Sequence, residues 1–445
     1  MSASNESKSK EEKVPQKRGG APPSSSVGGN HKQKPGHSDN QRKGGNNSSK
    51  TESKRGNSTA GTASASRGSN QKPPRLALFD HLPQPRCMQK ENTIQPDASI
   101  HPAIHKLGAL FASGIVYDDD DRAETLLIAF CNVIEDYKTP PRTTLSWDLD
   151  KHIKLQVHYL VSSCRPHSMA MGNIIKYLRF AISQVSPDLS EADAKALLIG
   201  KLRHFHTERV VFSRENICTR CCEGIRDGEV VLTFGSSPLL RSVLSTVRKN
   251  KNVRVIIVDS LPRWEGLRTL QLLTSSSSDE DLAGCVYAPL AGAASAMREA
   301  TRVILGASAL LSNGSVIAPA GTAMVAALAH SRGVPVIFAA ESFKFTEKVQ
   351  MDSIVYNELG DPADLLKPCE SGDGVYVPRE RGDGFRSAES ASPLPYQVLN
   401  LKYDVTPIRN VSAIVTEVGK VPPTSIPVLL RELKYESSDG DGGGH

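Results

Sequence analysis

The sequence is poor in aromatic residues, in cysteine and in long apolar runs, and each shortage excludes a class of protein. Its longest stretch of small apolar residues, 318–329, falls far short of the roughly 20 residues that a membrane helix needs. Its eight cysteines are scattered over 445 residues, unlike the dense framework of a small secreted domain. No apolar segment typical of a secretory signal follows the first lysines. We therefore expect a cytoplasmic (cytosolic) protein with no membrane partner.

Common cofactor and metal motifs are also missing. Neither a Walker A sequence nor Gly-x-Gly-x-x-Gly follows any expected strand, so neither route to nucleotide binding has support. Cys218, Cys221 and Cys222 resemble half of a zinc site, but no second cysteine pair lies at a suitable spacing. Their apolar neighbours near a helix end favour buried packing instead. We expect neither a metal nor a cofactor.

The net charge of +6 is unevenly distributed. Residues 1–75 contain 15 Lys and Arg against 5 Asp and Glu, which leaves 39 against 43 for the rest of the chain. Because this leader has almost no large apolar residue, we expect a disordered basic tail that extends to residue 95. Weak RNA contact by the tail is one interpretation, and a solubilising tail is the other. The absence of interleaved aromatic residues favours the second.

Residues 96–226 show the apolar period of an all-helical domain. Ile104, Leu107 and Phe111 recur at steps of three and four, and similar steps follow along the segment. Ser190 and Asp193 resemble a capping box in which Asp replaces the usual Glu. They are expected to open a long helix that ends before Asp227.

From residue 227 to 436 the pattern changes to short apolar runs separated by segments of helical length. Such alternation is typical of a parallel sheet with helices on both faces. The expected fold class is thus α/β, with the helical domain followed by a Rossmann-like, doubly wound parallel-sheet domain. Residues 437–445 are expected to form a frayed tail. The expected strands are Val230–Phe234, Val253–Val258, Val286–Pro289, Val303–Leu305 and Val334–Ala339.

Several long phrases over residues 97–435 resemble one known family. It unites methylthioribose-1-phosphate isomerase, ribose-1,5-bisphosphate isomerase and the alpha, beta and delta subunits of eukaryotic translation initiation factor 2B. Three phrases of the helical domain, at 100–108, 136–141 and 164–178, are similar to the delta subunits in particular. The core phrases are VVLTFGSS (230–237), VIIVDSLPRWEG (255–266), LGASALLSNGSVIAPAGT (305–322), ESFKF (341–345), NELGDP (357–362) and YDVTPIRNVSAIVTEVG (403–419).

The positions that match the isomerases' catalytic residues have changed. The resemblance places Gly235 where those enzymes have a cysteine and Ser308 where they have an acid/base aspartate. Leu261 stands where an arginine grips the substrate phosphate, although Arg263 is available as a displaced contact. Glycine cannot transfer a proton. We therefore expect a non-enzyme with a vestigial phosphate site, and an isomerase with a rearranged active site is the alternative.

The resemblance implies a regulatory and structural role in the guanine nucleotide exchange factor for translation initiation factor 2. Its implied partners are alpha, beta, gamma and epsilon subunits, with exchange catalysis in epsilon, and the phosphorylated alpha subunit of factor 2. The implied contact residues are Glu208, Arg209 and Phe212 on the long helix, together with Trp147. Glu208 and Phe212 are four residues apart and are expected to share one helix face. The alternative is a helix whose charges only keep it solvated.

The stretch 421–430 is unusually apolar for a position so near the chain end. It is either part of a subunit interface, which usually has an apolar centre, or a segment that closes the chain's own core.

Overall fold

The computed structural model describes residues 77–82, 99–275, 284–365 and 398–439, all within one compact unit that spans Asn70–His445. Most of the predicted basic tail, with its RNA contact, lies outside the described residues. The division of the body into two domains stays a prediction, because the described residues form a single unit.

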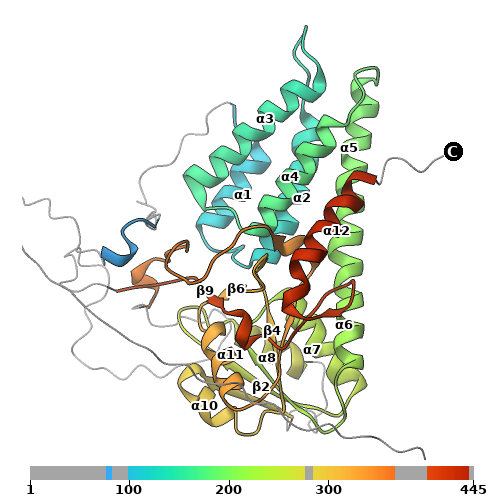
Figure 1. The fold of residues 1–445 in the computed structure, drawn as a ribbon. Coiled ribbons are helices and arrows are strands. Elements are labelled where there is room, and N and C mark those ends of the chain that lie inside the picture. Colours follow the sequence, from blue (N-terminus) through green and yellow to red (C-terminus); the bar gives the residue numbers. More distant parts are fainter. Residues whose placement is uncertain (1–76, 83–98, 276–283, 366–397, 440–445) are drawn as a thin grey trace, which may run out of the picture. The chain divides into compact units, whose positions relative to one another are not determined.

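The helical segment is confirmed. Its helices pack around a core that includes Ile104, Phe130, Ile153 and Leu198 (Figure 1). The helices are α1 (Pro102–Ala112), α2 (Asp119–Asp136), α3 (Leu145–Tyr159), α4 (Met169–Ser183), α5 (Glu191–Phe205) and α6 (Ser213–Glu223), with π-helical turns at Leu160–Cys164 and His206–Phe212.

The cap at the start of α5 differs in detail from a capping box. The Asp193 amide donates to Ser190 Oγ over 3.2 Å, as expected. Ser190 Oγ in turn donates to Asp193 Oδ2 over 2.6 Å. Aspartate is one methylene shorter than glutamate, and here its carboxylate takes the cap hydroxyl as its partner.

The long helix predicted after Ser190 is interrupted by a π-helical segment. The Ser213 amide donates to the Glu208 carbonyl, five residues earlier, where an α-helix would use a partner four residues away. The turn over His206–Phe212 is therefore wider than the α-helical turn from which the shared face of Glu208 and Phe212 is predicted. Periodicity does not reveal this difference.

The second segment is a mixed α/β structure built on a sheet of order β11-β10-β7-β4-β1-β2-β3, parallel except for β11. A smaller sheet, β8-β5-β6-β9, is not predicted by the sequence. The strands of the large sheet are β1 (Val230–Phe234), β2 (Arg254–Asp259), β3 (Cys285–Pro289), β4 (Arg302–Gly306), β7 (Val336–Ala339), β10 (Ala413–Val415) and β11 (Lys420–Val421). Those of the small sheet are β5 (Ala309–Leu311), β6 (Val316–Pro319), β8 (Phe345–Thr346) and β9 (Tyr403–Thr406).

Helices cover both faces of the large sheet, as a doubly wound arrangement requires. Alternate side chains of β1 enter different cores: Val231 packs on the side of α6, α7 and α8, while Leu232 and Phe234 pack on the side of α10, α11 and α12. The helices not yet bounded are α7 (Pro238–Asn250), α8 (Gly266–Ser275), α10 (Ala293–Ala296), α11 (Thr322–Ser331) and α12 (Ile426–Asp439).

The predicted tails are too long at both ends. Ala77–Phe79 forms a 3-10 helix, and the side chains of Phe79 and Leu82 are buried. Averaging composition over the whole leader hides this apolar cluster. At the other end, α12 continues to Asp439, so helix replaces the start of the tail predicted from residue 437.

Two stretches for which the sequence left alternatives open contribute side chains to the protein's own core. Cys218 and Cys221 lie in the core, where burial raises the pKa of the Cys221 thiol to about 12. Ile426 and Leu429, from the apolar stretch 421–430, pack in the core between the sheet and α12, although Val428 is exposed. Within the described ranges no group of three or more ligating side chains suits a metal ion. No described helix is long and apolar enough to cross a membrane.

A buried lysine joins the helical segment to the α/β segment. Lys344 Nζ lies 2.6 Å from Asp120 Oδ1, at the start of α2, and 2.8 Å from Glu341 Oε2, after β7. All three side chains are almost completely buried. Burial alone would lower the pKa of Lys344, but the two carboxylates raise it above its usual range. Nearby, Asn173 Nδ2 donates to the carbonyls of Phe343 and Phe345, each over 2.8 Å.

We predict that Lys344→Met lowers the free energy of unfolding by about 3–5 kcal/mol, because it leaves two buried carboxylates without their cation. The measurement is urea unfolding of the full chain. Lys348→Met is the matched control, since this exposed lysine lies four residues away, and we expect a change within about 0.5 kcal/mol. Equal losses in the two variants would contradict the role given to the buried ion pairs.

Candidate functional site

A cavity of about 80 Å³ opens at the carboxyl edge of the large sheet, and it brings together all four predicted vestigial positions. Gly235 follows β1, Leu261 and Arg263 follow β2, and Ser308 follows β4. This is the edge where doubly wound folds place ligands, because the carboxyl ends of parallel strands meet there. The grouping of these residues as one site is therefore a property of the structure.

The backbone around the cavity depends on two glycines with positive φ. Gly235 has φ +65°, a backbone conformation that favours glycine. Gly321 has φ +110°, and a Cβ there would lie 2.5 Å from the ring of Phe234. The loop after β2 contains a cis peptide bond between Leu261 and Pro262. The wall of the cavity is thus built by close backbone approach.

Arg263 lines the cavity, but its charge is already engaged by the chain. Its Nε lies 3.2 Å from Glu265 Oε1, and its Nη2 donates to the Gly114 carbonyl over 3.1 Å. The guanidinium carbon stands 3.9 Å from the centroid of the Tyr117 ring. An anion would have to compete with these three contacts for the same group.

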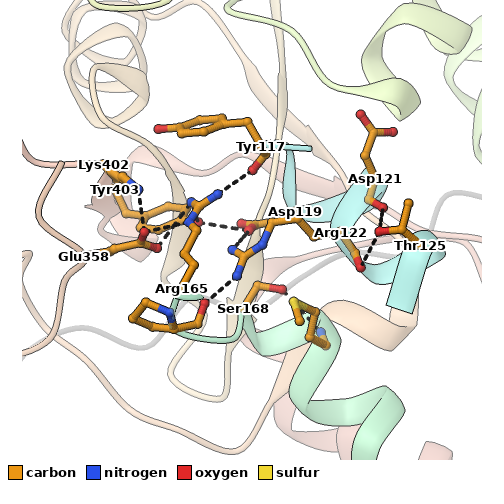
Figure 2. A network of polar contacts seen from close by, with 12 residues as sticks. Tyr117, Asp119, Asp121, Arg122, Thr125, Arg165, Ser168, Glu358, Lys402 and Tyr403 are labelled. Atoms are coloured by element: carbon orange, nitrogen blue, oxygen red, sulfur yellow. Dashed lines mark hydrogen bonds and ion pairs between the residues drawn. The ribbon is translucent and has the colours of Figure 1, made fainter. Parts of the chain in front are cut away.

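Tyr117 also faces two further cations, which a shared carboxylate holds in place. Arg165 and Lys402 lie 4.6 and 5.3 Å from the ring centroid. Glu358 receives Arg165 Nε at 2.6 Å and Lys402 Nζ at 2.5 Å (Figure 2). Burial opposes ionisation of Glu358, but Arg165 and Lys402 outweigh it and hold its pKa below its usual range.

A second polar group, at the start of α2, contributes Asp119 and Tyr403 to the lining of the cavity. Tyr403 Oη donates to Asp119 Oδ1 over 2.9 Å, and Arg122 Nη1 donates to the same oxygen over 3.2 Å. Arg122 Nη2 also donates to the Pro166 carbonyl. Figure 2 shows how this group adjoins the Arg165 and Glu358 pair. The helical segment and the α/β segment therefore both contribute residues to the site.

The charges that line the cavity favour an anion poorly. Four of the lining residues are acidic, and two are basic. Both basic side chains already form ion pairs, Arg263 with Glu265 and Lys402 with Glu358. Among the described residues, no uncommitted cation lines the cavity. The acidic residues are Asp118, Asp119, Asp259 and Glu265.

An adjoining cavity of about 50 Å³ shares Ser308 and Tyr403 with the first and contains a carboxyl group that the sequence analysis missed. Asp404 Oδ2 accepts hydrogen bonds from the amides of Gly321 and Ala323, over 2.7 and 2.8 Å. These amides belong to the start of α11, where partial positive charge favours an anion. Burial nevertheless raises the pKa of Asp404 to about 7. The sequence signal that could have revealed this carboxyl group is the position of Asp404 as a charged residue within the strand phrase 403–406.

The predicted contact residues of the long helix lie on its surface. Phe212 is 50% exposed, an unusual position for a phenylalanine, and Glu208 is also exposed. His204 Nε2 lies 3.5 Å from Glu208 Oε2. Arg209 is half-buried on the same π-helical segment. Their role in binding a partner stays a prediction.

Trp147 is exposed too, but it lies far from that group. Its neighbour Ser146 donates to the Val185 carbonyl, which places this end of α3 near the start of α5. Glu208 follows the end of α5, about 27 Å away from Ser190 at a rise of 1.5 Å per residue. The Trp147 ring instead has Lys151 Nζ at 5.5 Å from its centroid. The structure therefore does not join Trp147 to the Glu208 group.

The chain matches the sequence profile of the initiation factor 2 subunit family over residues 118–423. Translation initiation factor eIF2B subunit delta of Schizosaccharomyces pombe is 39% identical over 360 residues, covering 81% of this chain and 74% of that protein. The corresponding subunit of Dictyostelium discoideum is 34% identical over 368 residues, and the match spans just 57% of its length.

A more distant relative is an enzyme. Ribose 1,5-bisphosphate isomerase of Pyrococcus furiosus is 28% identical over 291 residues, covering 64% of this chain and 82% of the enzyme. Among solved structures, a chain of the tetrameric eIF2B-beta2-delta2 complex from C. thermophilum is similar, with a TM-score of 0.63 and 28% identity. That match covers 77% of this chain and 97% of the other.

The raised pKa of Asp404 predicts a specific pH dependence of stability. Because its folded pKa of about 7 exceeds the ordinary value of 3.8, its contribution to stability is present at low pH and is lost as the pH rises through about 7. Asp404→Asn keeps an oxygen acceptor for the two amides and removes the titration. We expect the variant to lose less stability than the wild type between about pH 5 and pH 8 in urea unfolding.

Asp188→Asn is the control for this experiment, since Asp188 is exposed. Its pH profile should parallel that of the wild type. A profile for Asp404→Asn that also parallels the wild type would contradict the assignment.

Proposed function

The chain belongs to the initiation factor 2 subunit family, and from this premise we propose that it is a regulatory subunit, of the delta kind, of the guanine nucleotide exchange factor for translation initiation factor 2. The observation that carries the proposal is the 39% identity to a delta subunit over 81% of the chain. In this role the chain acts in the cytosol and binds no cofactor of its own.

The chain is not an isomerase in this proposal, despite its isomerase-like fold. Gly235 has no side chain to move a proton, and Ser308 offers only a hydroxyl in place of a carboxylate. Arg263 and Lys402 are held by their own carboxylates and are not free to grip a phosphate. Exchange catalysis belongs to a partner, the epsilon subunit, and this chain contributes assembly and control.

Alpha, beta, gamma and epsilon subunits are the proposed partners. The similar C. thermophilum chain is part of a complex that contains beta and delta chains in equal number, which supports pairing with beta. A pairing surface needs an apolar centre that is exposed in the single chain. The most concentrated candidate among the described residues is the turn 349–356, where Val349, Met351, Val355 and Tyr356 are each 46–77% exposed.

We predict that Met351→Glu with Val355→Glu reduces the beta-containing complex at least tenfold, because two charges enter the apolar centre of the interface. Native mass spectrometry of the chain co-expressed with a beta partner measures the complex. Val418→Glu with Val428→Glu is the matched control, at two exposed positions near the chain end. If the control pair keeps the complex while the Met351 and Val355 pair loses it, the result supports the turn 349–356 as the interface.

If only the control pair loses the complex, the interface lies near the chain end and not at the turn 349–356. A discrete homodimer of the wild-type chain that ignores the beta partner would contradict the subunit proposal itself.

The second proposed role is sensing the phosphorylated alpha subunit of factor 2 through the surface around Glu208, Arg209 and Phe212. The support is the exposure of an apolar ring beside charged groups on one π-helical turn. Such turns often occur at functional sites, and an exposed aromatic ring is a frequent anchor in interfaces. Trp147 lies outside this surface and would make a separate contact.

We predict that Glu208→Lys weakens inhibition by phosphorylated factor 2. The measured quantity is the ratio of nucleotide exchange rates on unphosphorylated and phosphorylated factor by the complete complex, which should fall at least threefold toward one. This corresponds to a coupling change of about 0.7 kcal/mol or more. Glu215→Lys makes the same charge change on exposed α6 and should leave the ratio unaltered. An equal effect of both variants would point to net charge rather than to this surface.

A further inference from the structure

The edge of the large sheet opposite the cavity carries a concentration of cations. Five of them lie in the loops and helix ends that precede the parallel strands, and we name this set the amino-edge surface. Within the part of the chain that the structure describes, none of the five side chains forms an ion pair or hydrogen bond. The amino-edge surface consists of Arg226 before β1, Lys249 and Lys251 before β2, Arg298 before β4 and Arg332 before β7.

Main-chain hydrogen bonds hold these loops side by side. The Gly228 amide donates to the Asn252 carbonyl over 2.7 Å, which joins the loop before β1 to the loop before β2. The Thr301 amide donates to the Val230 carbonyl, and the Val303 amide donates to the Pro335 carbonyl. The order β7-β4-β1-β2 therefore places the five cations across four neighbouring strands. At about 4.8 Å per strand, this row is about 14 Å wide.

Three acidic residues in the described part of this edge have partners within the chain. Glu299 pairs with Arg254 at 2.9 Å, and Glu229 pairs with Arg302 at 2.9 Å. The Asp227 carboxylate accepts the Asn252 amide. Among the described residues, none of these three acidic side chains pairs with any of the five cations, although residues 76–445 contain more acidic than basic side chains. Such segregation of charge is a mark of an electrostatic binding surface.

Helix dipoles account for only part of this arrangement. The carboxyl end of a helix favours a cation, which explains Lys249 and Lys251 at the end of α7 and Arg332 at the end of α11. Arg226 and Arg298 lie beyond the ends of α6 and α10, and α10 has only four residues. The cluster therefore exceeds what the helix ends require.

The amino-edge surface also lacks the apolar centre of a protein interface. None of the exposed large apolar side chains among the described residues lies in these loops. A folded partner usually buries such a centre, and base stacking needs aromatic rings. Arginine is well suited to phosphate oxygens, because its planar guanidinium donates two parallel hydrogen bonds.

We propose that the amino-edge surface binds the phosphate backbone of RNA without regard to base sequence. This inference is independent of the proposed function. It also differs from RNA contact by the basic leader, because it assigns the contact to the folded body of the chain.

The test compares two triple variants of the full-length chain, both with the leader intact. Arg226→Glu, Lys249→Glu and Arg298→Glu alter the amino-edge surface. Lys106→Glu, Lys138→Glu and Lys176→Glu alter exposed lysines of the helical segment and change the net charge equally. Fluorescence anisotropy with labelled poly(U) of about 20 nucleotides gives Kd between about 50 and 200 mM salt.

We expect the amino-edge triple variant to weaken binding at least tenfold at about 100 mM salt. Its plot of log Kd against log salt should become shallower by about 2, since each lost phosphate contact contributes ~0.7 on single strands. The control triple variant should stay within about threefold of the wild type. Equal effects of the two triple variants would assign binding to overall charge and overturn the proposal.

A polyglutamate peptide of similar charge distinguishes an acidic protein partner from RNA. Loss of peptide binding in the amino-edge triple variant, with RNA binding unchanged, would also overturn the proposal. If that variant does not fold, ultraviolet cross-linking of the wild-type chain to 4-thiouridine RNA decides the question. Cross-links in residues 224–229 and 249–254 support the amino-edge surface, whereas cross-links in the leader alone exclude it.

Discussion

The arrangement of the described residues depends on one buried ion cluster. Lys344 lies between Asp120 of α2 and Glu341 after β7, with contacts of 2.6 and 2.8 Å. Burying three charges is costly, and the cost is recovered only if each charge keeps its partner and its geometry. The cluster therefore fixes where α2 begins. Asp118 and Asp119, which precede Asp120, reach the cavity at the carboxyl edge because of that position.

The same junction explains why the cavity is a poor site for an anion. Tyr117 and Arg165 come from the helical segment, whereas Glu358 and Lys402 come from loops of the α/β segment. In these ion pairs each cation already has a carboxylate partner. A phosphate would therefore have to break a partly buried ion pair to bind.

Much of this arrangement could be predicted from the sequence, and the failures share a physical cause. The apolar period located the helices, and the short apolar runs located the main strands. The family resemblance supplied Gly235, Leu261 and Ser308, and the structure groups them because parallel strands end at one edge of the sheet. The π-helical turn, by contrast, depends on packing, and no period in the sequence encodes it. The pair of Arg165 and Glu358 joins positions 193 residues apart, which local patterns cannot connect.

The two edges of the large sheet show opposite solutions to the same constraint. Parallel strands gather polar loops at both edges, so each edge accumulates charge that must be paired or left to solvent. At the carboxyl edge, the cations are paired within the chain. At the amino edge, Arg226, Arg298 and Arg332 form no ion pair with any described residue, although acidic residues outnumber basic ones in the body of the chain. An edge that keeps its charge exposed is suited to a partner that brings the opposite charge.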